Sequence, residues 1–295
     1  MRLVTYIAEG TQRAGVLVGE RVVDTAHAAR GAGLGSSDAA GSRVRDLLSA
    51  PPETLAKLAA AAEDADGVDV ASVELGPPVP DPEKILCIGL NYPEHAQEGD
   101  LPIPTSPIVF AKFRSALVGD RAQIHLPDRN PGMVDFEGEL AVVIGRRARK
   151  VPESQALQYV AGYMPFNDVT ARDLQLSSSQ WTMGKAFDTS GPCGPALVTS
   201  DEVPEPQELE LCTIHNGEVV QTASTREMIF SVAELVSYIS SLITLVPGDI
   251  IATGTPAGIG HVRQPPRYLG AGDTIEVEIE HLGRLTNTVV NGRAR

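Results

Sequence analysis

The sequence of 295 residues predicts a strand-rich α+β fold with a small N-terminal α/β unit. Three observations lead to this fold class. The 22 prolines and 28 glycines favour many turns, and therefore short strands. Short apolar or alternating runs outnumber helical patterns along the chain. Strands and helices do not alternate regularly, which argues against a Rossmann fold.

The N-terminal unit is predicted to contain three short strands and a helix. The strands are expected at Leu3–Ile7, Val16–Val18 and Val22–Val23. The Ala-rich stretch Thr54–Ala62 predicts the helix. Four prolines between residues 76 and 82 exclude a helix there and favour an extended linker. We therefore expect a small N-terminal domain over residues 1–76 and a larger domain over residues 77–295.

The larger domain is predicted to hold mostly strands and few helices. Strands are expected at Lys84–Gly89, Leu140–Ile144 and Thr274–Glu280. The pair Asn216-Gly217 between two apolar runs predicts a tight β-hairpin turn. A helix is expected from Ser231 to Ile243, where Glu234 completes a capping box. A second candidate helix spans Val151–Gly162.

The charge and cysteine content exclude several classes of protein. With 24 Lys+Arg against 38 Asp+Glu, the net charge of −14 argues against nucleic acid or an anionic membrane as the main partner. The three cysteines form no CxxC pair, so neither a disulfide framework nor a Cys-based zinc site is expected. The chain lacks a signal-like start and a long apolar run, and we expect a cytoplasmic protein.

Two acidic residues form the first candidate site. In an extended strand Glu137 and Glu139 project from the same face, next to the apolar run that follows. A hard divalent cation such as Mg²⁺, Mn²⁺ or Ca²⁺ explains such a pair. The alternative is a solvated strand edge, as expected for Glu276, Glu278 and Glu280, and the spacing alone favours that alternative.

A second cluster follows about thirty residues later. If Asp168 opens a helical turn, Arg172 and Gln175 lie on the same helix face. Taken alone, this spacing is better explained by a surface helix cap with an Asp–Arg ion pair. Lys185 is an isolated cation among small and apolar residues. It belongs either to a pocket wall or to the surface, with its stem lying along apolar neighbours.

Two further segments contain possible catalytic groups. If the chain is helical after Pro93, His95 and Glu98 are neighbours, and the carboxylate could orient the imidazole as a base. An exposed helical pair is an equally good interpretation. Residues 248–260 read as a strand leading into a Gly-rich loop. No Gly-Lys-Ser/Thr follows, which excludes a P-loop, and Pro256 weakens any match to a dinucleotide-binding motif.

Taken together and in order, seven segments closely resemble the fumarylacetoacetate hydrolase family. They are GLNYPEHAQE, PIVFAKFRSALVG, DFEGELAVVIG, GYMPFNDVTARDLQ, WTMGKAFDTSGPCGP, NGEVVQT and GDIIATGTPAGIG. The resemblance covers roughly residues 83–290, and the short N-terminal unit suits the two-part bacterial members. It implies a mixed β-sandwich roll that forms a homodimer.

The resemblance also implies roles for individual residues. The implied metal ligands are Glu137, Glu139 and Asp168, the catalytic residues His95, Glu98 and Lys185, and the substrate-binding residues Arg172, Gln175 and Thr255. The metal would be Mg²⁺ or Mn²⁺, with Ca²⁺ possible in crystals. His95 and Glu98 would form a dyad on a mobile lid, and Lys185 would supply positive charge for an anionic substrate.

The implied reaction is hydrolysis of a C–C bond in a 2-oxo or 1,3-diketo acid of the acylpyruvate or fumarylpyruvate type. The tyrosine-degradation enzyme carries another acidic metal ligand where this chain has Ile88-Gly89-Leu90, which places the chain among broader bacterial relatives. Decarboxylation of an oxaloacetate-like 2-oxo acid and isomerisation of a 2-hydroxymuconate-type acid from aromatic catabolism therefore remain alternatives. A non-catalytic protein that binds metal and dicarboxylates is a remote one.

Overall fold

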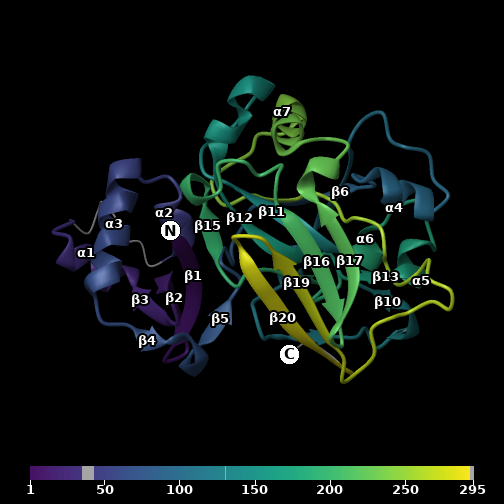
Figure 1. The fold of residues 1–295 in the computed structure, drawn as a ribbon, viewed down its shortest axis with the longest axis horizontal. Coiled ribbons are helices and arrows are strands. Elements are labelled where there is room, and N and C mark those ends of the chain that lie inside the picture. Colours follow the sequence, from purple (N-terminus) through teal and green to yellow (C-terminus); the bar gives the residue numbers. More distant parts are fainter. Residues whose placement is uncertain (35–42, 130, 293–295) are drawn as a thin grey trace.

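The computed structural model describes residues 1–34, 43–129 and 131–292. Two β-sheets, with helices packed around them, form the body of the molecule (Figure 1). The predicted strand-rich α+β fold class is confirmed. The N-terminal unit lies at one end of the long axis, on the left in Figure 1.

The N-terminal unit contains the strands and the helix that the sequence predicts. Its strands are β1 (Arg2–Ala8), β2 (Thr11–Val18), β3 (Arg21–Asp24), β4 (Val68–Asp69) and β5 (Glu74–Gly76). Its helices are α1 (Thr25–Gly31), α2 (Val44–Leu47) and α3 (Pro52–Asp64), with a 3₁₀ turn at Val70–Ser72. Strand β1 is central, because it pairs with β2 on one side and with β5 and β15 on the other.

One large sheet runs through both predicted domains. The strands of the larger unit in this sheet are β6 (Ile85–Gly89), β7 (Ile108–Lys112), β11 (Gly138–Ile144), β12 (Val160–Asn167), β15 (Leu197–Thr199) and β18 (Ile250–Ala252). The strand order is β4-β3-β2-β1-β15-β12-β11-β18-β6-β7, with β5 also on β1. The division at residue 76 stays a prediction, and the β1–β15 pairing carries hydrogen bonds across it.

A second sheet of five strands packs against the first. Its order is β17 (Glu218–Ser224), β16 (Glu210–His215), β19 (Thr274–Ile279), β20 (Gly283–Val290) and β9 (Gln123–His125). The predicted hairpin joins β16 to β17, and both turn residues, Asn216 and Gly217, have positive φ angles of 53° and 81°. Two small ladders complete the strands: β8 (Leu117–Val118) with β14 (Gly191–Pro192), and β10 (Val134–Asp135) with β13 (Thr170–Ala171).

The larger unit has four α-helices within the described residues. They are α4 (Pro93–Glu98), α5 (Arg172–Gln175), α6 (Thr182–Lys185) and α7 (Val232–Leu242), with 3₁₀ turns at Arg114–Ala116, Pro131–Met133, Glu153–Tyr159, Ser200–Glu202 and Thr225–Glu227. Helix α7 begins after Ser231 with the predicted capping box. The predicted helix Val151–Gly162 is wrong in its last three residues, because Val160 and Gly162 pair with β11 and begin strand β12, and its helical part is the 3₁₀ helix Glu153–Tyr159.

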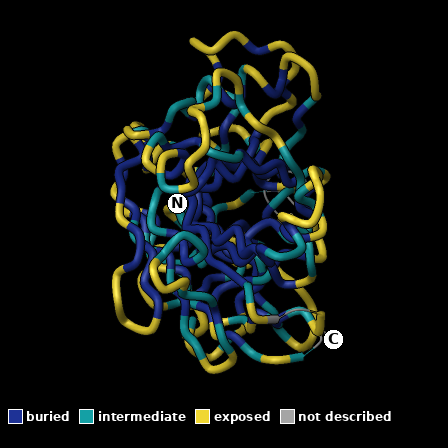
Figure 2. The backbone as a smooth tube through the Cα atoms, turned by 90° about the vertical axis from the view of Figure 1, so that its right-hand side faces the viewer, coloured by how far each residue is buried: buried dark blue, intermediate teal, exposed yellow. Residues whose placement is uncertain are grey.

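The two main cores lie on opposite faces of the large sheet. Leu140, Val142 and Ile144 of β11 point into the core shared with the five-stranded sheet and α7. Ala141 and Val143 of the same strand point into the core shared with the N-terminal helices. Figure 2 shows the buried backbone gathered in the centre of the molecule, with exposed segments around it.

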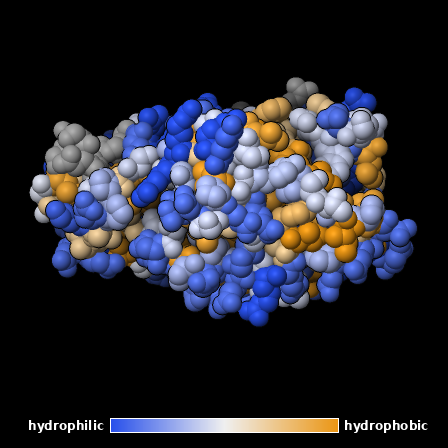
Figure 3. All heavy atoms as spheres, turned by 90° about the horizontal axis from the view of Figure 1, so that it is seen from above, coloured by the Kyte–Doolittle hydropathy of each residue, from blue (hydrophilic) through white to orange (hydrophobic). Residues whose placement is uncertain are grey.

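The apolar residues on the surface are not evenly spread. Seen from above, they gather mainly over the half of the molecule away from the N-terminal unit (Figure 3). The exposed large apolar side chains of the larger unit include Leu101, Ile103, Ile108, Val109, Phe113, Leu176, Met183 and Leu242. A concentration of this kind is a candidate contact surface.

Helix α7 allows a direct test of the core. Leu235 is fully buried between α7 and the sheets, whereas Leu242 on the same helix is 73% exposed. We expect Leu235→Ala to lower the free energy of unfolding by about 2–5 kcal/mol, because it removes buried methyl groups and leaves a cavity. Leu242→Ala is the control and should change it by less than about 0.5 kcal/mol in urea unfolding. Equal effects would contradict this packing.

Candidate active site

Three carboxylates meet where β11 begins and β12 ends. Glu137 immediately precedes β11, Glu139 is the second residue of β11, and Asp168 follows β12 directly. Because β11 and β12 are antiparallel, with Gly138 opposite Asn167, these positions are adjacent. One oxygen of each carboxylate lies within 4.8 Å of the other two. All three side chains are buried, so this is not a solvated strand edge.

The backbone around this cluster is held by buried amides. The side-chain oxygen of Asn167 accepts a hydrogen bond from the amide of Glu137 at 3.0 Å, and that of Gln221 accepts from the amide of Gly138 at 3.0 Å. A Cβ atom on Gly138 would lie 2.0 Å from the Thr213 hydroxyl oxygen, so only glycine fits between the two glutamates. Sequence analysis assigned Gln221 no role, although it lies in the NGEVVQT segment.

Three buried cations surround the carboxylates. The Nζ of Lys185 lies 2.6 Å from Glu137 and 2.8 Å from Asp168. The Nζ of Lys112 lies 2.6 Å from the other oxygen of Asp168, and Arg172 reaches Glu137 at 2.7 Å. Lys185 is only 2% exposed, so its interpretation as a surface lysine is wrong. Sequence analysis missed Lys112, whose only signal is a cation at the end of an apolar strand.

Negative charge nevertheless exceeds positive charge in this cluster. With Asp135, four buried carboxylates face three buried cations. Burial favours the neutral form of Glu137, but the charges of Lys185 and Arg172 outweigh it and lower its pKa to about 2. Burial, together with the charges of Asp168 and Glu137, raises the pKa of Glu139 well above its usual value. Glu139 receives one hydrogen bond, from the amide of Gly254 at 2.9 Å.

This distribution of charge fits a divalent metal ion. The three carboxylates offer only oxygen donors, which Mg²⁺ and Mn²⁺ prefer. The least compensated carboxylate, that of Glu139, faces the other two. The residues present therefore suit a hard cation, and Glu137, Glu139 and Asp168 are the side chains that would hold it.

Asp168, Arg172 and Gln175 come together by a different route from the predicted one. Asp168 does not open a helix, because its amide bonds the carbonyl of Glu137 and strand β13 follows. Helix α5 begins only at Arg172. Arg172 still points into the site and donates to the side-chain oxygen of Gln175 at 3.0 Å. Asp168 therefore does not share the helix face of Arg172 and Gln175, although Asp168 and Arg172 both lie beside Glu137.

The predicted His–Glu pair lies on α4, beside the cluster. The Nδ1 of His95 is 2.7 Å from one carboxylate oxygen of Glu98. The other oxygen of Glu98 accepts from the amide of Gly258, at 2.7 Å, in the Gly-rich loop. The same loop also donates from the amide of Gly254 to Glu139, so the pair and the carboxylates are bonded to one loop. With His95 8% exposed, the pair is not a solvated surface pair.

The Gly-rich loop after β18 closes one side of the site. The hydroxyl of Thr255 donates to the carbonyl of Gly138 at 3.0 Å and accepts from the side-chain amide of Gln221 at 2.8 Å. Gly254 has a φ of 101°, which other residues rarely adopt. Thr255 thus anchors the loop to the segment between the two glutamates, and its contact with substrate stays a prediction.

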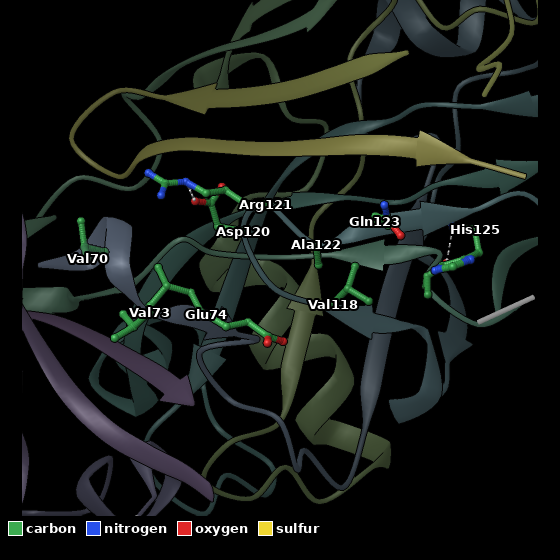
Figure 4. Close-up of a pocket in the computed structure, with 11 residues that line it drawn as sticks. Val70, Val73, Glu74, Val118, Asp120, Arg121, Ala122, Gln123 and His125 are labelled. Atoms are coloured by element: carbon green, nitrogen blue, oxygen red, sulfur yellow. Dashed lines mark hydrogen bonds and ion pairs between the residues drawn. The ribbon is translucent and has the colours of Figure 1, made fainter. Parts of the chain in front are cut away.

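A hollow lies between the N-terminal unit and strands β8 and β9. It has a volume of about 380 Å³, and its polar side chains include Glu74, Asp120, Arg121 and His125 (Figure 4). These groups are spread along the hollow instead of converging on one point. We therefore regard the carboxylate cluster, and not this hollow, as the candidate active site.

Comparison with known proteins identifies a family. The family described as "Fumarylacetoacetate (FAA) hydrolase C-terminal" matches residues 84–290. The chain is 47% identical over 215 residues to oxaloacetate tautomerase FAHD2A, mitochondrial, of Bos taurus, which covers 72% of this chain and 68% of that protein.

Two solved structures resemble the whole chain. Maleylpyruvate hydrolase from Sphingobium sp. SYK-6, in complex with manganese(II) and pyruvate, has a TM-score of 0.81 at 30% identity and covers 99% of this chain and 100% of its own. 2-Hydroxyhepta-2,4-diene-1,7-dioate isomerase from Mycobacterium marinum has a TM-score of 0.74 at 35% identity, with 100% of both chains covered. The predicted fold is confirmed by these matches.

No helix within the described residues is long and apolar enough to cross a membrane. The cytoplasmic location expected from the sequence stays a prediction, since the bovine relative is named as mitochondrial.

Proposed function

The chain belongs to the fumarylacetoacetate hydrolase family, and from this premise we propose that it is a metal-dependent enzyme that converts 2-oxo acids through their enol forms. The observation that carries the proposal is the convergence of a buried carboxylate triad, Lys185 and the His95–Glu98 pair. A binding protein without catalysis would not need a hydrogen-bonded histidine and carboxylate beside its metal ligands.

Glu137, Glu139 and Asp168 would hold the metal, which we propose to be Mg²⁺ or Mn²⁺. When bound, such an ion polarises the 2-oxo group and so makes the neighbouring C–H or C–C bond easier to break. The Mn²⁺ and pyruvate in the Sphingobium structure support this choice of metal and of substrate class. Lys185 and Arg172 supply the positive charge that an anionic substrate needs in a protein of net charge −14.

The His95–Glu98 pair is the proposed proton carrier. Because a carboxylate oxygen lies 2.7 Å from Nδ1, we assign the proton to Nδ1 and leave Nε2 free as the base. Nε2 can take a proton from the carbon next to the 2-oxo group, or from a water molecule. Glu98 then stabilises the imidazolium, and Lys185 stabilises negative charge that develops on the substrate.

Keto–enol tautomerisation of an oxaloacetate-like 2-oxo acid is our first candidate for the reaction. It is supported by the bovine relative, whose name states this activity, at 47% identity. The C–C hydrolysis expected from the sequence is the second candidate. It is supported by the hydrolase from Sphingobium and by a dyad that could activate water. The similarity to the isomerase from Mycobacterium marinum supports isomerisation of such an acid as a third candidate reaction.

The metal proposal predicts the behaviour of one substitution. Glu139→Gln should abolish turnover and remove the rise in melting temperature caused by added Mn²⁺, because it deletes an anionic ligand. At a Mn²⁺ concentration of 100 times Kd, that stabilisation amounts to about 2.7 kcal/mol. The control is Glu278→Gln, on the half-exposed face of β19. This variant should keep both the turnover and the rise in melting temperature with Mn²⁺. Full activity in excess EDTA would contradict the proposal.

The dyad and the first two candidate reactions can be tested together. His95→Ala should lower kcat by about 10²–10⁴-fold while Mn²⁺ still binds, the range expected when a general base is lost. The control is His281→Ala, which alters a 66% exposed imidazole beside Glu280 and should keep full activity. In H₂¹⁸O, tautomerisation accelerates loss of the enol absorbance and gives no fragment. Hydrolysis gives a new carboxylate that carries ¹⁸O. Wild-type rates for His95→Ala would exclude both mechanisms.

We also propose that the chain forms a homodimer, as expected from the sequence. Strand β7 ends the large sheet, and Ile108 and Val109 at its start are exposed. An exposed apolar edge strand pairs readily with another strand, and antiparallel pairing with its own copy gives a closed dimer. Exposed Leu101, Ile103 and Phe113 flank this edge in sequence and extend the apolar surface.

The dimer proposal predicts the mass in solution. Light scattering at micromolar concentration should give about twice the mass of one 31.2 kDa chain. Val109→Lys should shift the mass towards one chain, because it places a charge on the proposed edge. The control, Val219→Lys, changes an exposed residue on β17, the edge strand of the other sheet, and should leave the dimer intact. A monomeric wild-type chain would refute the dimer.

A further inference from the structure

Asp135, on strand β10, is a buried carboxylate that sequence analysis did not assign to the site. It is fully buried, and both of its oxygens accept several hydrogen bonds. Oδ1 accepts from the amides of Phe136 at 2.9 Å and Gly260 at 2.7 Å. Oδ2 accepts from the amide of His261 at 3.0 Å and from the Nε of Arg172 at 2.8 Å. The Nη2 of Arg172 also lies 2.8 Å from Oδ2.

These bonds join two parts of the site that are distant in sequence. Through Arg172, Asp135 is connected to Glu137, which the same guanidinium reaches at 2.7 Å. Through Gly260 and His261 it is connected to the end of the Gly-rich loop. Two residues earlier in that loop, the amide of Gly258 donates to Glu98 of the proposed dyad. Asp135 therefore lies between the metal-ligand side and the dyad side of the site.

The loop is packed directly on the Asp135 carboxylate. A Cβ atom on Gly260 would lie 2.7 Å from Oδ1 of Asp135 and 1.8 Å from the carbonyl oxygen of Arg267. No other residue leaves this space, so the close approach requires glycine. The amide of Leu269, after the loop, bonds the carbonyl of Val134, which fixes the returning chain to β10 as well.

We propose that Asp135 is a positioning residue that sets the orientation of Arg172 and the place where Glu98 docks on the loop. It does not touch the proposed substrate itself. Its kinetic effect rests on the proposed function, whereas its effect on the loop does not.

The chemistry of the side chain makes the proposal specific. Each oxygen of Asp135 accepts from at least two N–H groups. Asparagine has the same shape but only one oxygen, and its amino group would face N–H donors in either orientation. Asp135→Asn therefore removes at least two hydrogen bonds without changing volume, and it loosens either the loop or Arg172.

The test compares Asp135→Asn with a matched control. Asp249 is also fully buried, accepts from the amides of Lys84 at 2.9 Å and Val246 at 2.8 Å, and lies at the opposite end of β18 from the loop. Hydrogen exchange at the amides of residues 258–261 should become at least tenfold faster in Asp135→Asn and stay unchanged in Asp249→Asn. The kcat/KM should fall by about 10²-fold only in Asp135→Asn, because a misplaced charge disturbs orientation. The Kd for Mn²⁺ should change less than threefold.

Several outcomes would overturn the proposal. Unchanged exchange at residues 258–261 in a folded Asp135→Asn variant would do so, as would an equal loss of kcat/KM in Asp249→Asn. If Asp135→Asn does not fold, Arg172→Lys tests the same link, since it keeps the charge but removes the Nε bond. Exchange at residues 260 and 261 should then accelerate, and unchanged exchange counts against the link. A chain without activity on any 2-oxo acid refutes the proposed function alone, because the exchange result still decides the role of Asp135.

Discussion

Moving a carboxylate out of water costs several kcal/mol unless opposite charges and hydrogen-bond donors replace the water. This chain buries four carboxylates in one cluster, each at most 5% exposed. The compensating cations come from three separate elements: Lys112 from β7, Arg172 from α5 and Lys185 from α6. Helices α5 and α6 are each only four residues long, and their place beside the carboxylates follows from this requirement more than from their own helical tendency.

The register of β11 is the second consequence of this buried charge. Alternate residues of β11 point to opposite faces of the large sheet, so Leu140 lies in one core and Ala141 in the other. Glu139 shares the face of Ala141. A slip of one residue against β12 would move Glu139 into the core that Leu140 fills, among apolar side chains such as Val142 and Leu235. The charged site and the apolar core therefore specify the same strand pairing.

Local patterns predicted most of the elements but only part of the site. The hairpin at Asn216-Gly217, helix α7 and the pairing of His95 with Glu98 all depend on residues within a few positions of one another. Other interactions bridge long stretches of chain. Lys112 and Asp168 are 56 residues apart, and Asp135 and Gly260 are 125 apart. No spacing rule connects such positions, which is why the sequence alone assigned no role to Lys112, Asp135 and Gln221.

The same limit explains the two errors in secondary structure. Val151–Gly162 has a pattern compatible with a helix, but the pairing of Val160 with Ile144 ends the 3₁₀ turn and begins a strand. Asp168 has the sequence context of a helix cap, yet its amide is already bonded to Glu137. In both cases a partner distant in the sequence decided the local structure.

The shared sheet gives the N-terminal unit a protective role that is independent of catalysis. Strand β15 lies between β12 and β1, and Leu197 and Val198 pair with β1. Without the first three strands, β15 would be a bare apolar edge, and such edges recruit strands from other molecules. Leu3 also contributes to the core behind it. The N-terminal unit thus pairs with a strand edge that would otherwise be open, and a relative that lacks this unit needs another device to cover the same edge.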